Sequence, residues 1–172
     1  MRSRMVIVIL ASALFLVPSN SFSVLITWSA DLDPDQVVPG QSTPVTGAMG
    51  SASGDIDTDT NELSWDISWS GLSQDAEAVH FHGPAAPGAI GDLQIDVGPI
   101  SGLMSPSMGA MTIEEAQESD LLSGLWYIDI TTRFNPQGEI RGQMNTAPEP
   151  SMFLLFGTGL FGLAALKRKS FK

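Results

Sequence analysis

The clearest pattern in the chain is a strict alternation of apolar and polar residues over residues 62–70. Leu63, Trp65, Ile67 and Trp69 fall on one side of this segment, and serines and an aspartate fall on the other. A period of two residues is typical of a β-strand with one buried face. The pattern therefore predicts a half-buried antiparallel strand with its apolar face turned inward.

Similar but weaker patterns predict further short strands. Residues 47–56 alternate small side chains, and the turn-forming residues 57–61 join this segment to 62–70 as a hairpin. A second hairpin is predicted to turn through Asn135-Pro136-Gln137-Gly138. The remaining predicted strands are 24–32, 78–82, 93–97, 125–132 and 139–144.

One helix is predicted at residues 113–123. Thr112 and Glu115 have the spacing of a capping box, and Gly124 lies where a helix commonly ends. Residues 98–110, rich in glycine, serine and proline, are expected to form a mobile surface loop.

Together these elements predict an all-β domain. About seven short strands within residues 24–146 favour an antiparallel β-sandwich, immunoglobulin-like or superoxide-dismutase-like, with one short helix. A domain of this size can bury a core without disulfides, and the chain has no cysteine. Apolar helices are expected at both ends, so we divide the chain into a signal peptide at 1–23, a domain at 24–146 and a sorting or transmembrane segment at 147–172.

The charges are unevenly distributed. Residues 24–150 hold all 19 acidic residues but only Arg133 and Arg141 as basic ones, a net charge of −17 for this part of the chain. Binding to nucleic acid needs clustered basic side chains. The composition therefore excludes nucleic acid as a partner. The lack of cysteine also excludes zinc–thiolate sites and thiol catalysis.

The N-terminal segment has the three parts of a secretory signal. Arg2 and Arg4 precede the uncharged run at 5–17, and Ser21-Phe22-Ser23 fits a cleavage site. This apolar run is too short to span a bilayer, which favours a cleaved signal over the alternative, an uncleaved anchor.

The C-terminal segment resembles a PEP-CTERM sorting signal. An apolar stretch at 151–166 is preceded by Pro148-Glu149-Pro150 and followed by the basic cluster Lys167-Arg168-Lys169. The resemblance implies recognition and removal by an exosortase, a membrane protease. The alternative is a plain membrane anchor, and in either case the basic cluster predicts a cytoplasmic C-terminus. The G-x-G-x-x-G at 157–162 lies inside this apolar stretch and lacks the context of a dinucleotide site.

The middle of the chain resembles the CHRD domain, a secreted module. Its most specific motif is Gly-Glu-Ile-Arg-Gly-Gln at 138–143, in which Gly138, Glu139, Arg141 and Gly142 are the candidate structural residues. The other matching patches are 30–32 with 38–39, 63–72, 78–83 with Gly88 and Gly91, and 124–132. The resemblance implies an extracellular β-sandwich with a poorly defined biochemical role. Thr131 stands where family members commonly have a third histidine.

His80 and His82 are the only histidines and the main candidate site. On a strand they share a face, so both could bind one zinc or copper ion, completed by a carboxylate of Glu139, Asp92 or Asp129. The alternative is structural: the imidazoles hydrogen-bond the loop at 83–91 and hold it against the sheet.

Three other features have alternative interpretations. The acidic hairpin at 55–62 could contact calcium, although it lacks EF-hand spacing and a solvated turn is favoured. Glu139 and Arg141 could form a cross-strand ion pair with an acid such as Asp129, or contact a ligand. The four tryptophans are expected in the core rather than on a sugar-binding platform.

These observations predict an exported, non-enzymatic protein. We expect a component of the cell surface or of the extracellular matrix or biofilm, with an exosortase as its processing partner and exopolysaccharide or other surface proteins as further partners. The C-terminal segment should place it in the membrane before processing. No cofactor is expected, and no catalytic motif is evident. The alternative is a metal-binding protein or metal-dependent enzyme that uses His80 and His82, with zinc, copper or calcium as its ion.

Overall fold

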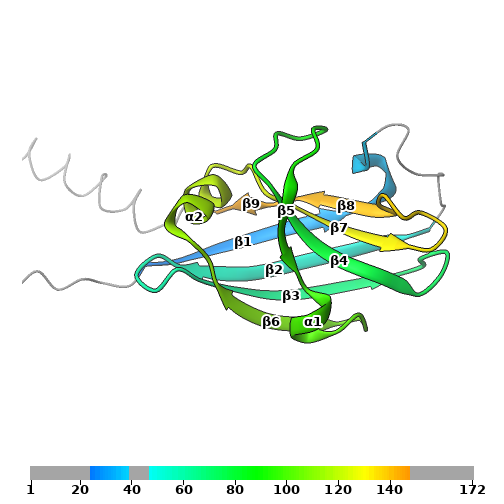
Figure 1. Ribbon diagram of the computed structural model, residues 1–172, viewed down its shortest axis with the longest axis horizontal. Helices are drawn as coiled ribbons and strands as arrows, with labels where there is room; N and C mark the ends of the chain where they lie inside the picture. The colour runs from blue at the N-terminus through cyan, green and yellow to red at the C-terminus, as the bar shows by residue number, and fades with distance from the viewer. Residues whose placement is uncertain (1–23, 39–46, 148–172) are drawn as a thin grey trace, which may run out of the picture.

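The computed structural model describes residues 24–38 and 47–147. They form two antiparallel sheets packed face to face, which confirms the predicted all-β sandwich (Figure 1). The five-stranded sheet has the order β6-β3-β2-β1-β9, and the four-stranded sheet has the order β5-β4-β7-β8. The strands are β1 Leu25–Leu32, β2 Met49–Asp57, β3 Glu62–Ser70, β4 Ala76–Gly83, β5 Asp92–Asp96, β6 Ser107–Thr112, β7 Tyr127–Thr132, β8 Ile140–Gln143 and β9 Asn145–Thr146. The helical turns are η1 Pro34–Gln36, α1 Gly98–Ser101 and α2 Glu115–Leu122.

An aromatic cluster fills the space between the two sheets. Phe81 of β4 is fully buried, and its ring centroid lies 6.0 Å from that of Trp28, 5.5 Å from that of Trp65 and 6.3 Å from that of Trp126. These three tryptophans are 0–3% exposed, as expected for core residues, whereas Trp69 is only partly buried. Three of the four indoles are therefore unavailable as a sugar-binding platform.

The segment predicted as a mobile loop contains ordered structure. Residues 98–101 form α1, and β6 is an edge strand paired with β3, with Leu63 opposite Met111 and Ile67 opposite Ser107. The inward position between them is Gly109, where a Cβ atom would lie 2.7 Å from the Trp65 ring. Because glycine and serine occupy inward positions of β6, the apolar alternation that marks a buried face is absent from its sequence.

The helix begins later than predicted. Thr112 is still paired with Glu62 in the sheet, and the N-cap of α2 is Glu114. The Gln117 side chain accepts a hydrogen bond of 2.9 Å from the Glu114 backbone N–H, so the capping box lies two residues further along. Gly124 has a φ of 73° just after the helix, as predicted for a left-handed terminal glycine.

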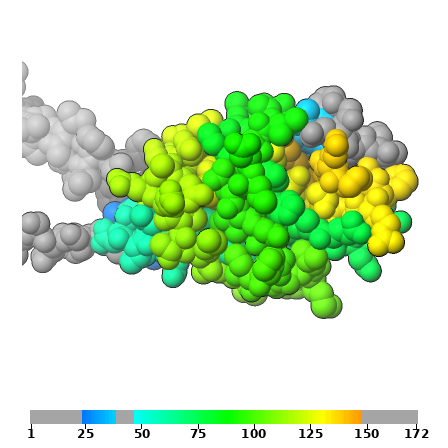
Figure 2. Space-filling model, in the orientation of Figure 1, coloured from blue at the N-terminus to red at the C-terminus, as the bar shows by residue number. Residues whose placement is uncertain are grey.

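The first and last strands of the domain lie side by side. β9 pairs with β1, so the points where the chain enters and leaves the sandwich share one end (Figure 1). η1 and the turn between β7 and β8 lie at the opposite end. Figure 2 shows α2 and the β7–β8 turn at the two sides of the visible face, separated by the middle of the chain.

The two predicted sorting segments lie outside the described residues. These are the signal peptide at 1–23, with its expected helix, and residues 148–172. Within the described part of the chain, no helix has the length and apolar character needed to cross a membrane.

Candidate functional site: a histidine–aspartate groove

Strand register brings the candidate residues together on the four-stranded sheet. His80 of β4 lies opposite Asp129 of β7, and Asp129 lies opposite Arg141 of β8. His82 lies opposite Tyr127, one step along the same strands. Since alternate residues of a strand point to the same side, these side chains share the outer face of the sheet, while Phe81 points into the core.

A groove of about 540 Å³ covers this outer face, and we call it the histidine groove. Its rim includes Val37 and Val38, after η1, and residues 136–138 of the β7–β8 turn. Its floor includes His80, His82, Tyr127, Asp129, Thr131 and Arg141. The groove therefore extends toward the end of the sandwich that lies away from the entering and leaving chain.

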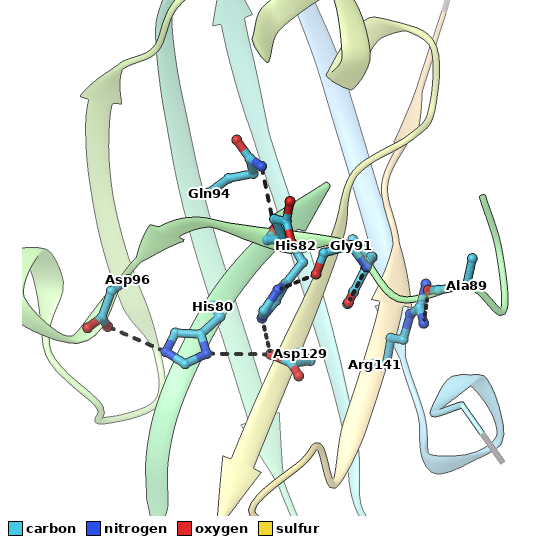
Figure 3. Close-up of polar contacts among 10 residues, drawn as sticks. His80, His82, Ala89, Gly91, Gln94, Asp96, Asp129 and Arg141 are labelled. Carbon is cyan, nitrogen blue, oxygen red and sulfur yellow. Dashed lines mark hydrogen bonds and ion pairs between the residues drawn. The ribbon is translucent and has the colours of Figure 1, made fainter. Parts of the chain in front are cut away.

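The two imidazoles converge on one carboxylate oxygen (Figure 3). The Asp129 Oδ1 atom lies 3.4 Å from His82 Nε2 and 3.9 Å from His80 Nδ1. On the far side of each ring, His82 Nδ1 lies 3.1 Å from the Gly91 carbonyl oxygen and His80 Nε2 lies 3.9 Å from Asp96 Oδ1. Asp129 Oδ1 is buried, and the nearer of its two imidazole neighbours is His82 Nε2.

His82 carries out the structural role that the sequence suggested. Its Nδ1 atom bonds the Gly91 carbonyl and so ties the 84–91 loop to the sheet. Burial by itself lowers the pKa of His82, but the Asp129 carboxylate and the carbonyls of Gly91 and Asp92 outweigh it and raise that pKa above its ordinary value. His80 makes no such contact with the loop.

Tyr127 connects the histidine side of the groove to Arg141. The His82 and Tyr127 rings are stacked, with centroids 5.2 Å apart and an interplanar angle of 10°. The Arg141 Cζ atom lies 3.5 Å from the Tyr127 ring centroid. Its Nη1 atom donates to the Ala89 carbonyl at 2.8 Å, and its Nη2 atom donates to Gln143 Oε1 at 3.3 Å.

The predicted ion pair between Arg141 and Asp129 is not formed. The two residues are direct cross-strand neighbours, but the guanidinium is engaged by Tyr127, Ala89 and Gln143 instead. Arg141 is 3% exposed, so its planar group acts as a buried link between the sheet and the 84–91 loop. Tyr127 was not a candidate from the sequence, because its importance depends on the strand register.

Glu139 lies in a different polar cluster. Its carboxylate accepts hydrogen bonds from the Ser73 backbone N–H and hydroxyl, from Thr132 Oγ1 at 2.6 Å and from Asn135 Nδ2 at 3.3 Å. Burial alone would raise the pKa of Glu139, but these hydrogen bonds outweigh it and hold that pKa below its ordinary value. The structure therefore places Glu139 among hydroxyls rather than with the histidines, and it is not a candidate ligand.

The two glycines of the 138–143 motif have backbone roles. Gly138 has a φ of 122°, a conformation that favours glycine. At Gly142 a Cβ atom would lie 2.6 Å from the Asp31 carbonyl oxygen, because β8 passes close to the end of β1. The motif is thus explained by a turn, a buried carboxylate, a buried guanidinium and a close backbone approach.

The acidic hairpin between β2 and β3 is a local turn. Asp57 Oδ1 accepts the backbone N–H groups of Asp59 and Thr60 at 2.9 and 3.3 Å, as in an Asx turn. Among the residues that the structure describes, the one group of three potential ligands with metal-binding spacing is His80, His82 and Asp129, whose ligand atoms lie within 4.8 Å of one another. Asp92, a candidate from the sequence, is not part of it.

Comparisons with known proteins agree with both resemblances. The CHRD domain model matches residues 28–144, and the PEP-CTERM protein-sorting motif matches residues 146–169. No curated protein and no solved structure matches the chain. The first match covers most of the chain, and the second supports export with a transient C-terminal membrane anchor that an exosortase processes. The chain therefore belongs to the CHRD-domain family and is an exosortase-sorted extracellular protein.

Proposed function

We propose that the protein is a non-enzymatic component of the cell surface or extracellular matrix, with the histidine groove facing away from its site of attachment. The observation that carries this proposal is the position of the sorting motif. Only Asn145 separates the CHRD match from the PEP-CTERM match, and Asn145 is in β9, at the end where the chain leaves the sandwich. A domain attached there presents its opposite end, with η1 and the β7–β8 turn, to the surroundings.

The state of the buried carboxylate Glu139 removes it as a candidate general base. A general base needs a pKa near the working pH and access to a substrate proton. Glu139 is 1% exposed, its pKa is lowered and its oxygens accept hydrogen bonds from Ser73, Thr132 and Asn135. These features suit a structural carboxylate and make Glu139 a poor base.

Cell fractionation tests the processing and the destination. In a host with an exosortase, we expect a shortened chain in the surface or matrix fraction, and in an isogenic host without it, the full-length chain in the membrane fraction. A variant with alanine at Pro148, Glu149 and Pro150 should stay at full length in the membrane fraction even in the host that has the exosortase. Full-length chain in the membranes of both hosts would contradict processing. A shortened chain found only in the free medium would contradict a surface or matrix role.

The absence of cysteine allows a clean test of orientation. We expect the C-terminus to be cytoplasmic before processing, because Lys167, Arg168 and Lys169 follow the apolar stretch. In the host without exosortase, a membrane-impermeant maleimide should label Ser51→Cys, on an exposed position of β2, and leave Ser170→Cys unlabelled until the cells are opened. Equal labelling of both variants in intact cells would overturn this topology.

A further inference from the structure

We infer that His80, His82 and Asp129 form a binding site for a divalent transition metal of the Zn²⁺ class, open to the histidine groove. This inference is independent of the surface role proposed above. It rests on three side chains from two neighbouring strands, whose positions are set by the pairing of β4 with β7. Their ligand atoms lie within 4.8 Å of one another, and all three residues line the groove.

The distance between the His82 and Asp129 ligand atoms suits tetrahedral coordination, and the distance between the His80 and Asp129 ligand atoms approaches it. With bonds of about 2.0–2.1 Å, two ligand atoms of a tetrahedral zinc site lie about 3.3–3.4 Å apart. The His82 Nε2 to Asp129 Oδ1 distance is 3.4 Å. The His80 Nδ1 to Asp129 Oδ1 distance is 3.9 Å, so a small rotation of the His80 side chain, which is 23% exposed, would complete the set.

The hydrogen bonds around His82 leave the right atom free. When the Nδ1–H of neutral His82 donates to the Gly91 carbonyl, the Nε2 atom carries a lone pair and faces Asp129 Oδ1. Two acceptors then face each other, whereas a protonated His82 ring would donate its Nε2–H to Asp129 Oδ1. A buried acceptor left unpaired is costly, and a cation between the two atoms would satisfy both.

The surroundings hold the His82 ring as the second layer of a metal site does. Histidine ligands usually bond a carbonyl or carboxylate through their other nitrogen, which fixes the ring orientation. Gly91 has this position beside His82, and Asp96 lies on the corresponding side of His80. Tyr127 stacks on His82 and further restricts its ring.

The donor set selects the class of metal. Two imidazoles with one carboxylate favour a divalent transition metal such as zinc, copper, nickel or iron, whereas calcium and magnesium prefer all-oxygen sites. Three protein ligands leave a fourth tetrahedral position for a water molecule or a small anion that enters through the groove. Thr131 lines the groove beside this site.

Isothermal titration calorimetry of the purified full chain in detergent, at about pH 7.5, tests the site. Zinc chloride should bind once per chain with micromolar or tighter affinity, and calcium chloride should give no heat of binding. Asp129→Asn should weaken zinc binding about tenfold or more. The matched control is Asp66→Asn, on an exposed position of β3, which should bind zinc as the natural chain does.

A second measurement separates loss of the site from loss of the fold. Histidine nitrogen NMR shifts should show His82 Nε2 coordinated when zinc is added, with its Nδ1 still protonated. Zinc should also raise the melting temperature of the natural chain but not that of Asp129→Asn, whose circular dichroism should be unchanged. No saturable zinc uptake, equal zinc affinity in Asp129→Asn, or a His82 ring protonated on both nitrogens in the presence of zinc would each overturn the inference.

Discussion

Arg141 lies over the ring of Tyr127, with its Cζ atom 3.5 Å from the ring centroid. Because β7 lies between β4 and β8, the ring has His82 on one side and the guanidinium on the other. The same guanidinium donates to the Ala89 carbonyl, so one buried cation joins the sheet to the 84–91 loop. The shape of the histidine groove depends on this contact, since Ile90 of the loop lines it.

Arg141→Lys should lower the free energy of unfolding by about 1–2 kcal/mol, although it keeps the charge. A lysine ammonium cannot stack on Tyr127 and also reach both the Ala89 carbonyl and Gln143. Urea unfolding followed by tryptophan fluorescence measures the change. Arg133→Lys is the matched control, because Arg133 is 82% exposed and pairs only with Glu77 at the surface. Its effect should stay below about 0.5 kcal/mol, and equal losses at both positions would contradict a special role for Arg141.

Glu139→Gln should destabilise the protein by about 2 kcal/mol at neutral pH, because it removes a charged acceptor of several buried hydrogen bonds. The pKa of Glu139 is lower in the folded protein than its ordinary value. Its ionised form therefore stabilises the fold fully above about pH 4.3, the unfolded pKa, and this contribution is lost as the pH falls through the lower folded pKa.

Thermal unfolding measured from neutral to acidic pH checks this prediction. The difference in melting temperature between the natural chain and Glu139→Gln should be constant near neutrality and should narrow below about pH 4.3. Glu77→Gln changes an exposed carboxylate and should leave the melting temperature almost unchanged. A difference that stays the same down to the acid limit would show that the charge of Glu139 is not what stabilises the fold.

Thr131→His should strengthen zinc binding about tenfold or more, because it adds a third imidazole beside the inferred site. Thr131 lines the same groove as His80, His82 and Asp129. Calorimetric titration with zinc measures the gain. Thr131→Val, which has the same shape but no metal ligand, should bind zinc as the natural chain does. An unchanged affinity in Thr131→His would place the metal elsewhere.

Gln117→Ala should cost about 1 kcal/mol of stability, since it removes half of the capping box of α2. It also breaks the 2.8 Å hydrogen bond from Gln117 Nε2 to Gln94 Oε1, which joins the helix to β5. Glu115→Ala, at the exposed residue that the sequence pattern favoured as the capping partner, should have a smaller effect. Chemical denaturation of the two variants measures both losses of stability. A larger loss in Glu115→Ala than in Gln117→Ala would favour the capping box of Thr112 and Glu115 instead.

The local period of the chain was enough to predict much of the fold. Alternation over residues 62–70 identifies β3 and its buried face, and Leu63 and Ile67 are indeed fully buried. Such alternation arises because one face of the strand packs on the core. The buried residues of the strand can therefore be identified from the sequence alone. β6 could not be predicted in this way, because its inward positions include Ser107 and Gly109 and so carry little apolar signal.

The site could be predicted only in part. The spacing of His80 and His82 shows that they share a face, and Asp129 was one of three carboxylates that could join them. Which carboxylate does so depends on the register of β4 with β7, and no local pattern specifies it. The stacking of Tyr127 and the separate position of Glu139 depend on the same long-range pairing.

The pairing of β9 with β1 also has a mechanical consequence. Tension transmitted from a point of attachment through residue 147 reaches the sandwich first at β9, which is held to β1 by two residue pairs. β1 is held to β2 by eight pairs, so it should yield only under a much larger load. We expect β9 to peel away first under strain and to lengthen the tether, while the core strands and the groove at the far end stay intact.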